Sequence, residues 1–303
     1  MDLKSKIFLI YGATATGKSE FALKLSKKIN GEIINADSMQ IYKELKILSA
    51  RPLKKNYKKI RHHLYGFQNV KKNFSAGDWL KLVDKKILDI KRRKRTPILV
   101  GGTGLYFKTL TNGLSQIPNI PIKFRKQVRT LHKKLGSKNF FLKLLKVDPL
   151  VKNRINSSDT QRCIRAYEVK KFTNKSMYHW FLNTESNYPQ KDLIKICIDF
   201  PREELLKRIN FRAREMIKNG AIPEVKRFLK LRVHKNKSAY KAIGINEVKE
   251  YLDKKIEIND VVEKISIKTR QYAKRQVTWA RGNMLDWNWL KSKNLNQYVK
   301  KIK

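Results

Sequence analysis

A short segment near the start of the chain has residue types and a spacing that suit phosphate binding. It follows the pattern G-x-x-x-x-G-K-[ST] and consists of Gly12, Ala13, Thr14, Ala15, Thr16, Gly17, Lys18 and Ser19. An apolar run, 7–11, precedes these residues, which we name the phosphate loop, and a helical pattern follows them. Backbone N–H groups and a helix N-terminus then form a cup for an anion, Lys18 adds positive charge, and Ser19 offers a hydroxyl to Mg²⁺. The segment predicts a polyphosphate site without specifying ATP, since an ordinary glycine turn needs neither the lysine nor the serine.

Two other turns follow apolar runs in the same way. Asp37 comes after 33–34, and its carboxylate can bind Mg²⁺, accept a proton, or simply cap a turn or a helix. The turn 101–104 comes after 97–100; its glycines allow a ligand to approach closely and Thr103 offers a hydroxyl, although a plain strand-to-helix turn explains it as well. Because the carboxyl ends of parallel strands meet at one edge of a sheet, we expect both turns to lie beside the phosphate loop.

Three groups of basic residues could bind phosphate or RNA. Arg208 and Arg212 share one helix face, and arginine grips phosphate with a planar fork, although a solvated helix face explains the pair equally well. The segments 269–281 and 161–165 interleave basic residues with aromatic or amide side chains. Such mixtures can contact RNA phosphates and unpaired bases, and they also occur on amphipathic helices with a basic outer face.

The alternation of apolar runs and helical patterns predicts the elements that position these residues. We expect an α/β fold in which a parallel sheet core contains residues 1–111 and 191–303, and a mainly helical insertion contains residues 112–190. Strands are expected at 7–11, 33–34, 97–100 and 193–200. Helices are expected at 79–91, 123–135, 159–172, 203–219 and 261–281, with 291–303 as a loose basic end.

The composition narrows the partners and the compartment. Among 303 residues, 70 Lys and Arg stand against 25 Asp and Glu, a formal charge of +45 that indicates a polyanionic partner, a lysine-biased genome, or both. Cys163 and Cys197 provide no disulfide framework, so a reducing compartment is expected. No apolar run approaches the ~18 residues of a membrane span, and a strand beginning at residue 7 leaves no room for a signal peptide, so we expect a cytoplasmic protein. The histidines have no metal-ligand spacing with the cysteines, and no G-x-S-x-G elbow is present, so neither a zinc site nor acyl transfer is predicted.

The order and spacing of the motifs resemble the tRNA dimethylallyltransferase family across nearly the whole chain. The matching segments are 12–19, 37–42, 51–52, 62–64, 101–106, 147–149, 159–168, 208–220, 242–244 and 269–279. The chain departs from the family pattern at Ala13, where proline is usual, at Arg51, where lysine is usual, at Arg61, where proline is usual, and at Ile245, where tyrosine is usual.

This resemblance implies transfer of the dimethylallyl group from dimethylallyl diphosphate to N6 of adenosine 37, in tRNAs that read codons beginning with U. The phosphate loop and Arg208 would hold the diphosphate, Ser19 would bind the cofactor Mg²⁺, and Asp37, Thr103 and Arg212 would be catalytic. The protein would act as a monomer on the anticodon stem-loop, without a membrane. Its tRNA contacts would be Asp37, Ser38, Met39, Gln40, Thr103, Arg125, Gln161, Arg162, Cys163, Ile164, Arg165, Lys274, Arg275, Gln276, Trp279 and Arg281.

Other functions are compatible with parts of the sequence. The phosphate loop also suits an ATPase or a kinase of small metabolites, although no apolar run ends in the paired acids that would complete such a site. The positive charge alone suits an RNA-binding protein without catalysis. A related reaction prenylates free adenine nucleotides; the helical insertion and the charge favour tRNA as the substrate.

Overall fold

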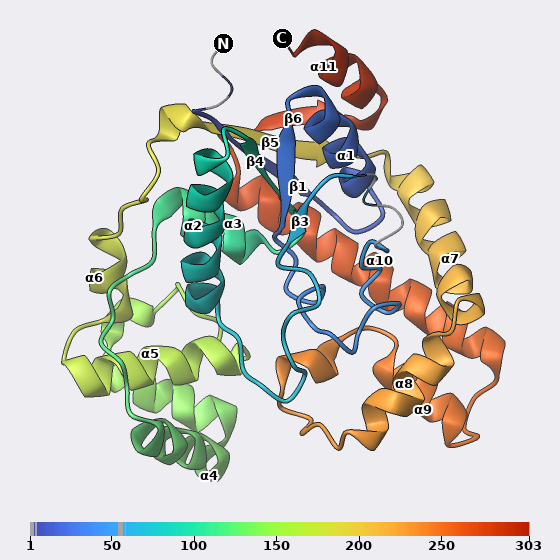
Figure 1. Cartoon of the computed structure of the whole chain (residues 1–303). Coiled ribbons are helices and arrows are strands. Elements are labelled where there is room, and N and C mark those ends of the chain that lie inside the picture. Colours follow the sequence, from blue (N-terminus) through green and yellow to red (C-terminus); the bar gives the residue numbers. More distant parts are fainter. Residues whose placement is uncertain (1–2, 4, 54–56, 58, 303) are drawn as a thin grey trace. The chain divides into compact units, whose positions relative to one another are not determined.

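A parallel six-stranded sheet forms the centre of the computed structural model, which describes residues 3, 5–53, 57 and 59–302 (Figure 1). The strand order is β3-β2-β4-β1-β5-β6 and every pairing is parallel. The strands are β1 (Ile7–Gly12), β2 (Gly31–Asn35), β3 (His62–His63), β4 (Thr96–Gly101), β5 (Leu193–Asp199) and β6 (Asn288–Lys291). The predicted α/β class and parallel sheet are confirmed. The strands β3 and β6, at the two edges, were not predicted.

Helices cover both faces of the sheet, which explains why β1 is apolar along its whole length. On one face, Phe8 and Ile10 pack in a cluster with residues of α1 (Lys18–Lys28) and α11 (Leu295–Lys301). On the other face, Ile7 and Leu9 pack with residues of α2 (Ala76–Arg92), α3 (Gly104–Asn112) and the end of α10 (Ile258–Asn283). Strand β1 therefore lies in the middle of a three-layer core, and the loop that follows it is held from both sides.

Four helices form a second apolar cluster in the same part of the chain. They are α7 (Arg202–Lys218), α8 (Ala221–Lys230), α9 (Ile245–Leu252) and the first half of α10, and they pack around the loop that contains Ile41, Tyr42 and Leu45. The expected helices at 203–219 and 261–281 correspond to α7 and α10. Because α10 has 26 residues, it contributes to this cluster at one end and to the sheet core at the other.

The end of the chain differs from the loose basic tail that the sequence suggested. Residues 288–291 form β6 and pair with β5, and α11 then returns to pack on α1. The ring of Tyr298 lies 6.0 Å from that of Phe21, and Lys24 Nζ donates a hydrogen bond to Asn296 Oδ1. The prediction was wrong because the lysines of this segment face solvent while its few apolar side chains are half-buried against the sheet core.

The compact units of the structure are residues 1–111 with 188–303, and residues 112–187. The second unit contains α4 (Ile122–Val147), α5 (Thr160–Thr173) and α6 (Met177–Leu182) around its own apolar core. Gly136, with φ of +71°, divides α4 near the end of the predicted helix 123–135. Short 3-10 helices lie at Pro149–Val151, Gln190–Asp192, Ser238–Lys241 and Ser292–Asn294. None of the helices in the described part of the chain is both long and apolar enough to cross a membrane.

Candidate active site

The phosphate loop has the shape of an anion cup. It joins β1 to α1, and its backbone is left-handed at Ala15, with φ of +67°, and at Gly17, with φ of +84°. The hydroxyl of Thr16 donates to the carbonyl of Ala13 at 2.9 Å, and Lys18 Nζ donates to the same carbonyl at 3.2 Å. These contacts hold the loop in a closed shape, with the Lys18 ammonium against its backbone.

A cavity of about 550 Å³ lies in front of this loop and brings together residues from several segments of the first unit. The phosphate loop contributes Thr14, Lys18 and Ser19, and α7 contributes Arg208 and Arg212. Other lining residues are Asp37, Ser38, Met39, Gln40, Leu48, Ser49, Ala50, Met216, Lys241, Thr269, Tyr272 and Arg275. The cavity thus gathers the predicted cations and the predicted carboxylate in one place.

Asp37 lies just after the C-terminal end of β2, where a turn and hydrogen bonds to its neighbours hold it in place. Its Oδ1 accepts from the N–H of Met39 at 2.9 Å, and its own N–H donates to Asn35 Oδ1 at 2.9 Å. This is an Asx turn, which the sequence left as one of the alternatives. Among the described residues nothing donates a hydrogen bond to Oδ2, so one carboxylate oxygen serves the turn and the other is available to a ligand.

Thr103 acts on the loop that carries Asp37. Its Oγ1 accepts from the N–H of Ser38 at 2.9 Å and donates to Ser38 Oγ at 3.2 Å. The backbone approach here needs glycine at 101, where an added Cβ would lie 1.9 Å from the carbonyl oxygen of Ala36. Through these contacts with Ser38, Thr103 orients the turn that contains Asp37.

Three cations converge beside the phosphate loop. Arg212 Nη1 donates to Thr14 Oγ1 at 3.3 Å, and the Arg208 guanidinium stacks over the ring of Phe200 at 5.0 Å, next to Gly17. The pKa of Lys18 is lowered to about 8, chiefly by burial; Asp37 opposes this shift and the nearby Arg212 adds to it. Burial, and then Arg208, lower the pKa of Arg212. This accumulation of positive charge is what a site for a polyanion requires.

The cavity has few oxygen ligands for a metal ion, which suits Mg²⁺ because this ion also binds substrate phosphates. Ser19, at the second position of α1, and Asp37 line the same cavity. Within the described ranges, no group of three or more His, Cys, Asp or Glu side chains could hold a metal ion. Mg²⁺ is usually bound through one or two protein oxygens plus substrate phosphates. The cavity offers that incomplete set of ligands.

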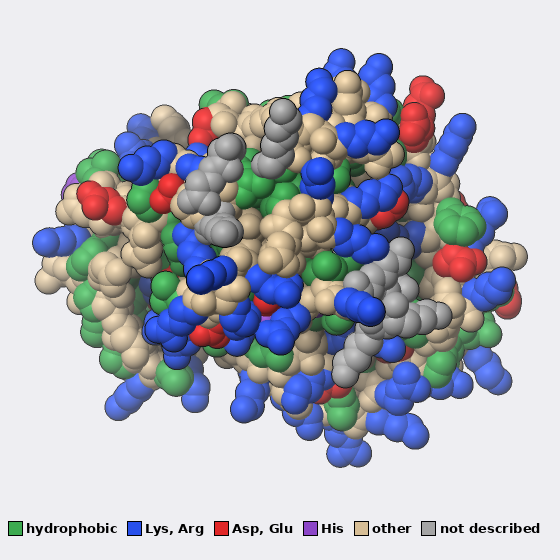
Figure 2. All heavy atoms as spheres, turned by 45° about the horizontal axis from the view of Figure 1, so that its top comes forward, with side chains coloured by type: hydrophobic (Ala, Val, Ile, Leu, Met, Phe, Trp, Pro, Cys, Tyr) green, Lys and Arg blue, Asp and Glu red, His purple; other side chains and the backbone are tan. Residues whose placement is uncertain are grey.

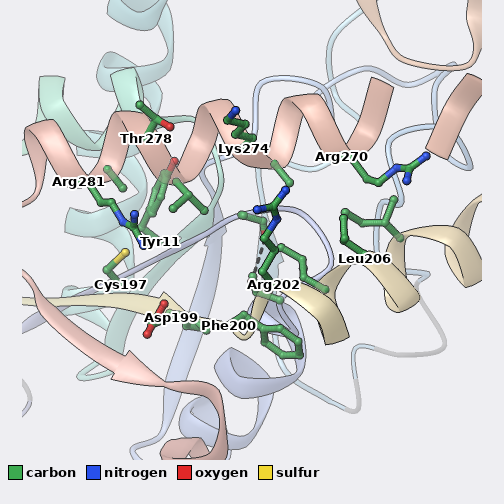
Figure 3. Close-up of a pocket in the computed structure, with 18 of the residues that line it drawn as sticks. Tyr11, Cys197, Asp199, Phe200, Arg202, Leu206, Arg270, Lys274, Thr278 and Arg281 are labelled. Atoms are coloured by element: carbon green, nitrogen blue, oxygen red, sulfur yellow. Dashed lines mark hydrogen bonds between the residues drawn. The ribbon is translucent and has the colours of Figure 1, made fainter. Parts of the chain in front are cut away.

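The helix α10 does not present its predicted tRNA-binding residues on one face. Arg275 lines the cavity of the phosphate loop, whereas Lys274 and Arg281 line a second cavity of about 470 Å³ between α7 and α10 (Figure 3). Gln276 is 5% exposed and Trp279 packs against Gly104, where an added Cβ would lie 2.2 Å from its ring. The expectation of a direct tRNA contact for the Gln276 side chain is therefore revised, because that side chain is buried. Trp279 is half-buried, and its contact with tRNA stays a prediction.

In the second unit, the predicted tRNA-binding residues also divide between surface and core. Gln161 and Arg162 are exposed at the start of α5, where the Asp159 side chain caps the helix. Arg125 and Arg165 both approach the buried carboxylate of Glu168, at 3.3 and 3.6 Å. The remaining predicted residues are Cys163, 1% exposed, and Ile164, 8% exposed. Those two belong to the apolar core of this unit, so the prediction that their side chains contact tRNA is revised.

The structure also contains site-supporting residues that the sequence did not reveal. The carboxylate of Glu224, 4% exposed in α8, accepts hydrogen bonds of 2.8 to 3.1 Å from the N–H groups of Lys46, Ile47 and Leu48. Gln40 Nε2 donates to the carbonyl of Ser49 at 3.0 Å in the same loop. These contacts shape one wall of the cavity. An acid in the first turn of a helix is so common that no sequence signal distinguishes this one.

The departures from the expected family pattern have individual surroundings. Arg51 donates to the carbonyls of Tyr42 and Lys43, at 2.9 and 3.3 Å, and leaves no space for a side chain at position 66. Ile245 is fully buried in the second apolar cluster. Arg61 is exposed. The arginine at position 51 is thus used to hold a loop, and none of the three replaces a group of the phosphate loop.

Comparisons with known proteins agree on one family. The family model of IPP transferase matches residues 40–283. A protein of Pelagibacter ubique called tRNA dimethylallyltransferase is 55% identical over 303 residues, covering 100% of this chain and 97% of the relative. A protein of the same description from Rickettsia massiliae is 40% identical and covers 99% of this chain and 83% of the relative.

Solved structures lead to the same family. A eukaryotic dimethylallyltransferase described as acting on tRNA superposes with a TM-score of 0.81 and 26% identity, covering 97% of this chain and 75% of that one. A tRNA isopentenylpyrophosphate transferase of Bacillus halodurans gives a TM-score of 0.70 and 29% identity, with 98% and 95% of the two chains covered.

Proposed function

The chain belongs to the IPP transferase family, and we propose that it transfers the dimethylallyl group of dimethylallyl diphosphate to N6 of adenosine 37 in tRNAs that read codons beginning with U. The observation that carries this proposal is the shared cavity. In it the phosphate loop and the cations Lys18, Arg208 and Arg212 lie together with the Asp37 carboxylate, which has one available oxygen. A diphosphate and a nucleophile that loses a proton need these two kinds of group.

The carboxylate suits the proton transfer. The exocyclic amine of adenine is a weak nucleophile because its lone pair is delocalised into the ring. As the N6–C bond forms, Asp37 Oδ2 accepts the proton that N6 loses. Asp37 can keep a fixed position during this step because its Oδ1 stays in the Asx turn and Thr103 holds the following residue.

The cations suit the departure of diphosphate. The C–O bond breaks as the N–C bond forms, and negative charge grows on the diphosphate oxygen that leaves. Lys18, Arg208 and Arg212 supply preorganised positive charge for that oxygen. Ser19 offers an oxygen to Mg²⁺, which when bound would neutralise part of the diphosphate charge. The nucleophile and the leaving group must act on opposite sides of the reacting carbon, so we place the base on the Asp37 side and the diphosphate on the Lys18 side.

The substrate nucleoside must leave its stack to enter this cavity. Enzymes that modify a base in a stacked nucleic acid extrude it into a pocket. The exposed Gln161 and Arg162, together with Arg125, Arg165 and the basic side chains of α10, are proposed to hold the anticodon stem-loop. Lys and Arg side chains cover much of the face seen in Figure 2, which supports a polyanionic partner. We also propose that the protein works as a monomer in the cytoplasm, and light scattering during gel filtration tests the monomer.

The decisive experiment is an assay of the product. The chain is incubated with dimethylallyl diphosphate, Mg²⁺ and either an unmodified tRNA that reads a codon beginning with U or the same tRNA with guanosine at position 37, and the RNA is digested to nucleosides. We expect N6-dimethylallyladenosine from the first tRNA alone. Its absence there would refute the proposed function. A parallel reaction with AMP distinguishes tRNA from a free nucleotide as the acceptor.

A further inference from the structure

Gln276 of α10 connects the phosphate loop to the glycine turn after β4. Its side-chain Oε1 accepts a hydrogen bond from the N–H of Thr14 at 2.9 Å, and its Nε2 donates to the carbonyl of Gly102 at 2.8 Å. Its backbone carbonyl accepts from the hydroxyl of Tyr11 at 2.9 Å. A buried residue on a helix thus joins the end of β1, the phosphate loop and the turn that carries Thr103.

The amide of Gln276 is chemically suited to this place. One end of the group must accept from an N–H and the other must donate to a carbonyl, and a neutral amide does both. A carboxylate would place a second acceptor against the Gly102 carbonyl, and an apolar side chain would leave two buried polar groups without partners. The fit is also steric, because a Cβ at Gly102 would lie 2.2 Å from Gln276 Nε2.

This contact decides which groups of Thr14 face the cavity. Because the N–H of Thr14 is directed at Gln276, the hydroxyl of Thr14 is left to accept from Arg212 at 3.3 Å. The contacts therefore run from α10 through Thr14 to Arg212, one of the cations beside the phosphate loop. Loss of the amide would let Thr14 turn and would release Arg212.

We propose that Gln276 is a positioning residue that fixes the phosphate loop and Arg212 for diphosphate binding and departure. This inference deepens the proposed function and rests on it. Gln276 itself does not touch the substrate, because it is buried behind the loop. Tyr11, whose hydroxyl donates to the backbone carbonyl of Gln276, lines the second cavity, and Figure 3 shows it beneath α10.

The test compares Gln276→Glu and Gln276→Leu with the wild type and with Gln297→Glu, a matched change of charge at an exposed position in α11. Measured quantities are turnover, the KM values of dimethylallyl diphosphate and tRNA, the affinity for inorganic diphosphate, and Tm. Loss of the amide contacts should lower kcat/KM for dimethylallyl diphosphate by about 10- to 100-fold. The reason is that each lost buried hydrogen bond loosens the phosphate loop and Arg212. The KM of tRNA and the values of Gln297→Glu should stay unchanged.

A pH profile separates positioning from general damage. In Gln276→Glu, a protonated carboxyl can again donate to the Gly102 carbonyl, and burial favours that neutral form. The ratio of its turnover to that of the wild type should therefore rise as the pH falls, whereas the ratio for Gln276→Leu should stay flat. Gly102→Ala pushes the amide of Gln276 away and leaves Gln276 itself unchanged. It should lower kcat/KM as Gln276→Leu does, and it tests the proposal even if Gln276→Leu folds poorly.

The outcomes are distinguishable from a failure of the proposed function. Binding of inorganic diphosphate is measured without tRNA, so it reports on the loop even if the wild type forms no prenylated nucleoside. Weaker diphosphate binding in the Gln276 variants and in Gly102→Ala supports the inference. Wild-type diphosphate affinity and kcat/KM in Gln276→Leu, or a pH-independent ratio for Gln276→Glu, would overturn it.

Discussion

The lowered pKa of Lys18 makes diphosphate binding depend on pH in a specific way. Burial, partly offset by Asp37 and aided by Arg212, brings this pKa to about 8, against an ordinary value of 10.5. The charged ammonium attracts the diphosphate, so the ligand binds the protonated form and raises the pKa in the complex. The sign follows: affinity is full well below about pH 8, falls above it, and binding there takes up a proton.

The size of the effect can be worked out from that pKa. With a pKa of about 8, the protonated fraction of Lys18 is about 0.9 at about pH 7 and about 0.1 at about pH 9. If only the protonated form binds, the affinity for diphosphate falls by a factor of about 10 across this interval. Diphosphate itself also titrates, so the measurement needs a control in which the protein charge does not change.

Lys18→Arg provides that control, because a guanidinium stays charged throughout this interval. Isothermal titration calorimetry with inorganic diphosphate at a fixed Mg²⁺ concentration gives both affinities, and buffers of different ionisation enthalpy give the proton uptake. We expect the ratio of wild-type to variant affinity to fall by a factor of about 10 from about pH 7 to about pH 9. A constant ratio, or no difference in proton uptake, would refute the reasoning about Lys18.

Three other predictions address the base, the cavity wall and the RNA surface. Asp37→Asn should lower the rate of prenyl transfer by about 10²- to 10⁴-fold with little change in tRNA affinity, measured by single-turnover assay and filter binding; undiminished transfer would exclude Asp37 as the base. Glu224→Gln should lower the free energy of unfolding by about 1–3 kcal/mol, because the buried group that accepts hydrogen bonds from the N–H groups of Lys46, Ile47 and Leu48 loses its charge. Urea unfolding measures this change, and an unchanged midpoint would contradict the prediction. Binding of tRNA should weaken steeply with added salt as counterions are released, and a flat plot of log affinity against log salt would mean that the basic surface is not where RNA binds.

The sequence determined the features that depend on a few neighbouring residues. The phosphate loop could be recognised because its shape and its ligand-binding groups lie within one turn between a strand and a helix. Asp37 and Thr103 could be placed beside it because both follow apolar runs, and parallel strands end at one edge of a sheet. The long helices α2, α7 and α10 followed from their apolar periodicity.

Tertiary structure alone decided which face of each helix meets which surroundings. Arg212 and Gln276 both lie on helices with basic outer faces, and the sequence could not tell which side chains turn inward. Packing places Arg212 against Thr14 and buries Gln276 between two loops. In the second unit, packing places Cys163 and Ile164 in the apolar core.

The ends of the sheet were decided in the same way. The strand β6 and the helix α11 are short and rich in lysine, so no local pattern favours them, and they exist because β5 and α1 offer a strand edge and an apolar surface. Local sequence fixes what a backbone segment prefers to be. The neighbours of each side chain depend on contacts between residues far apart in the chain, which in this protein are made only when the sheet and its helices assemble.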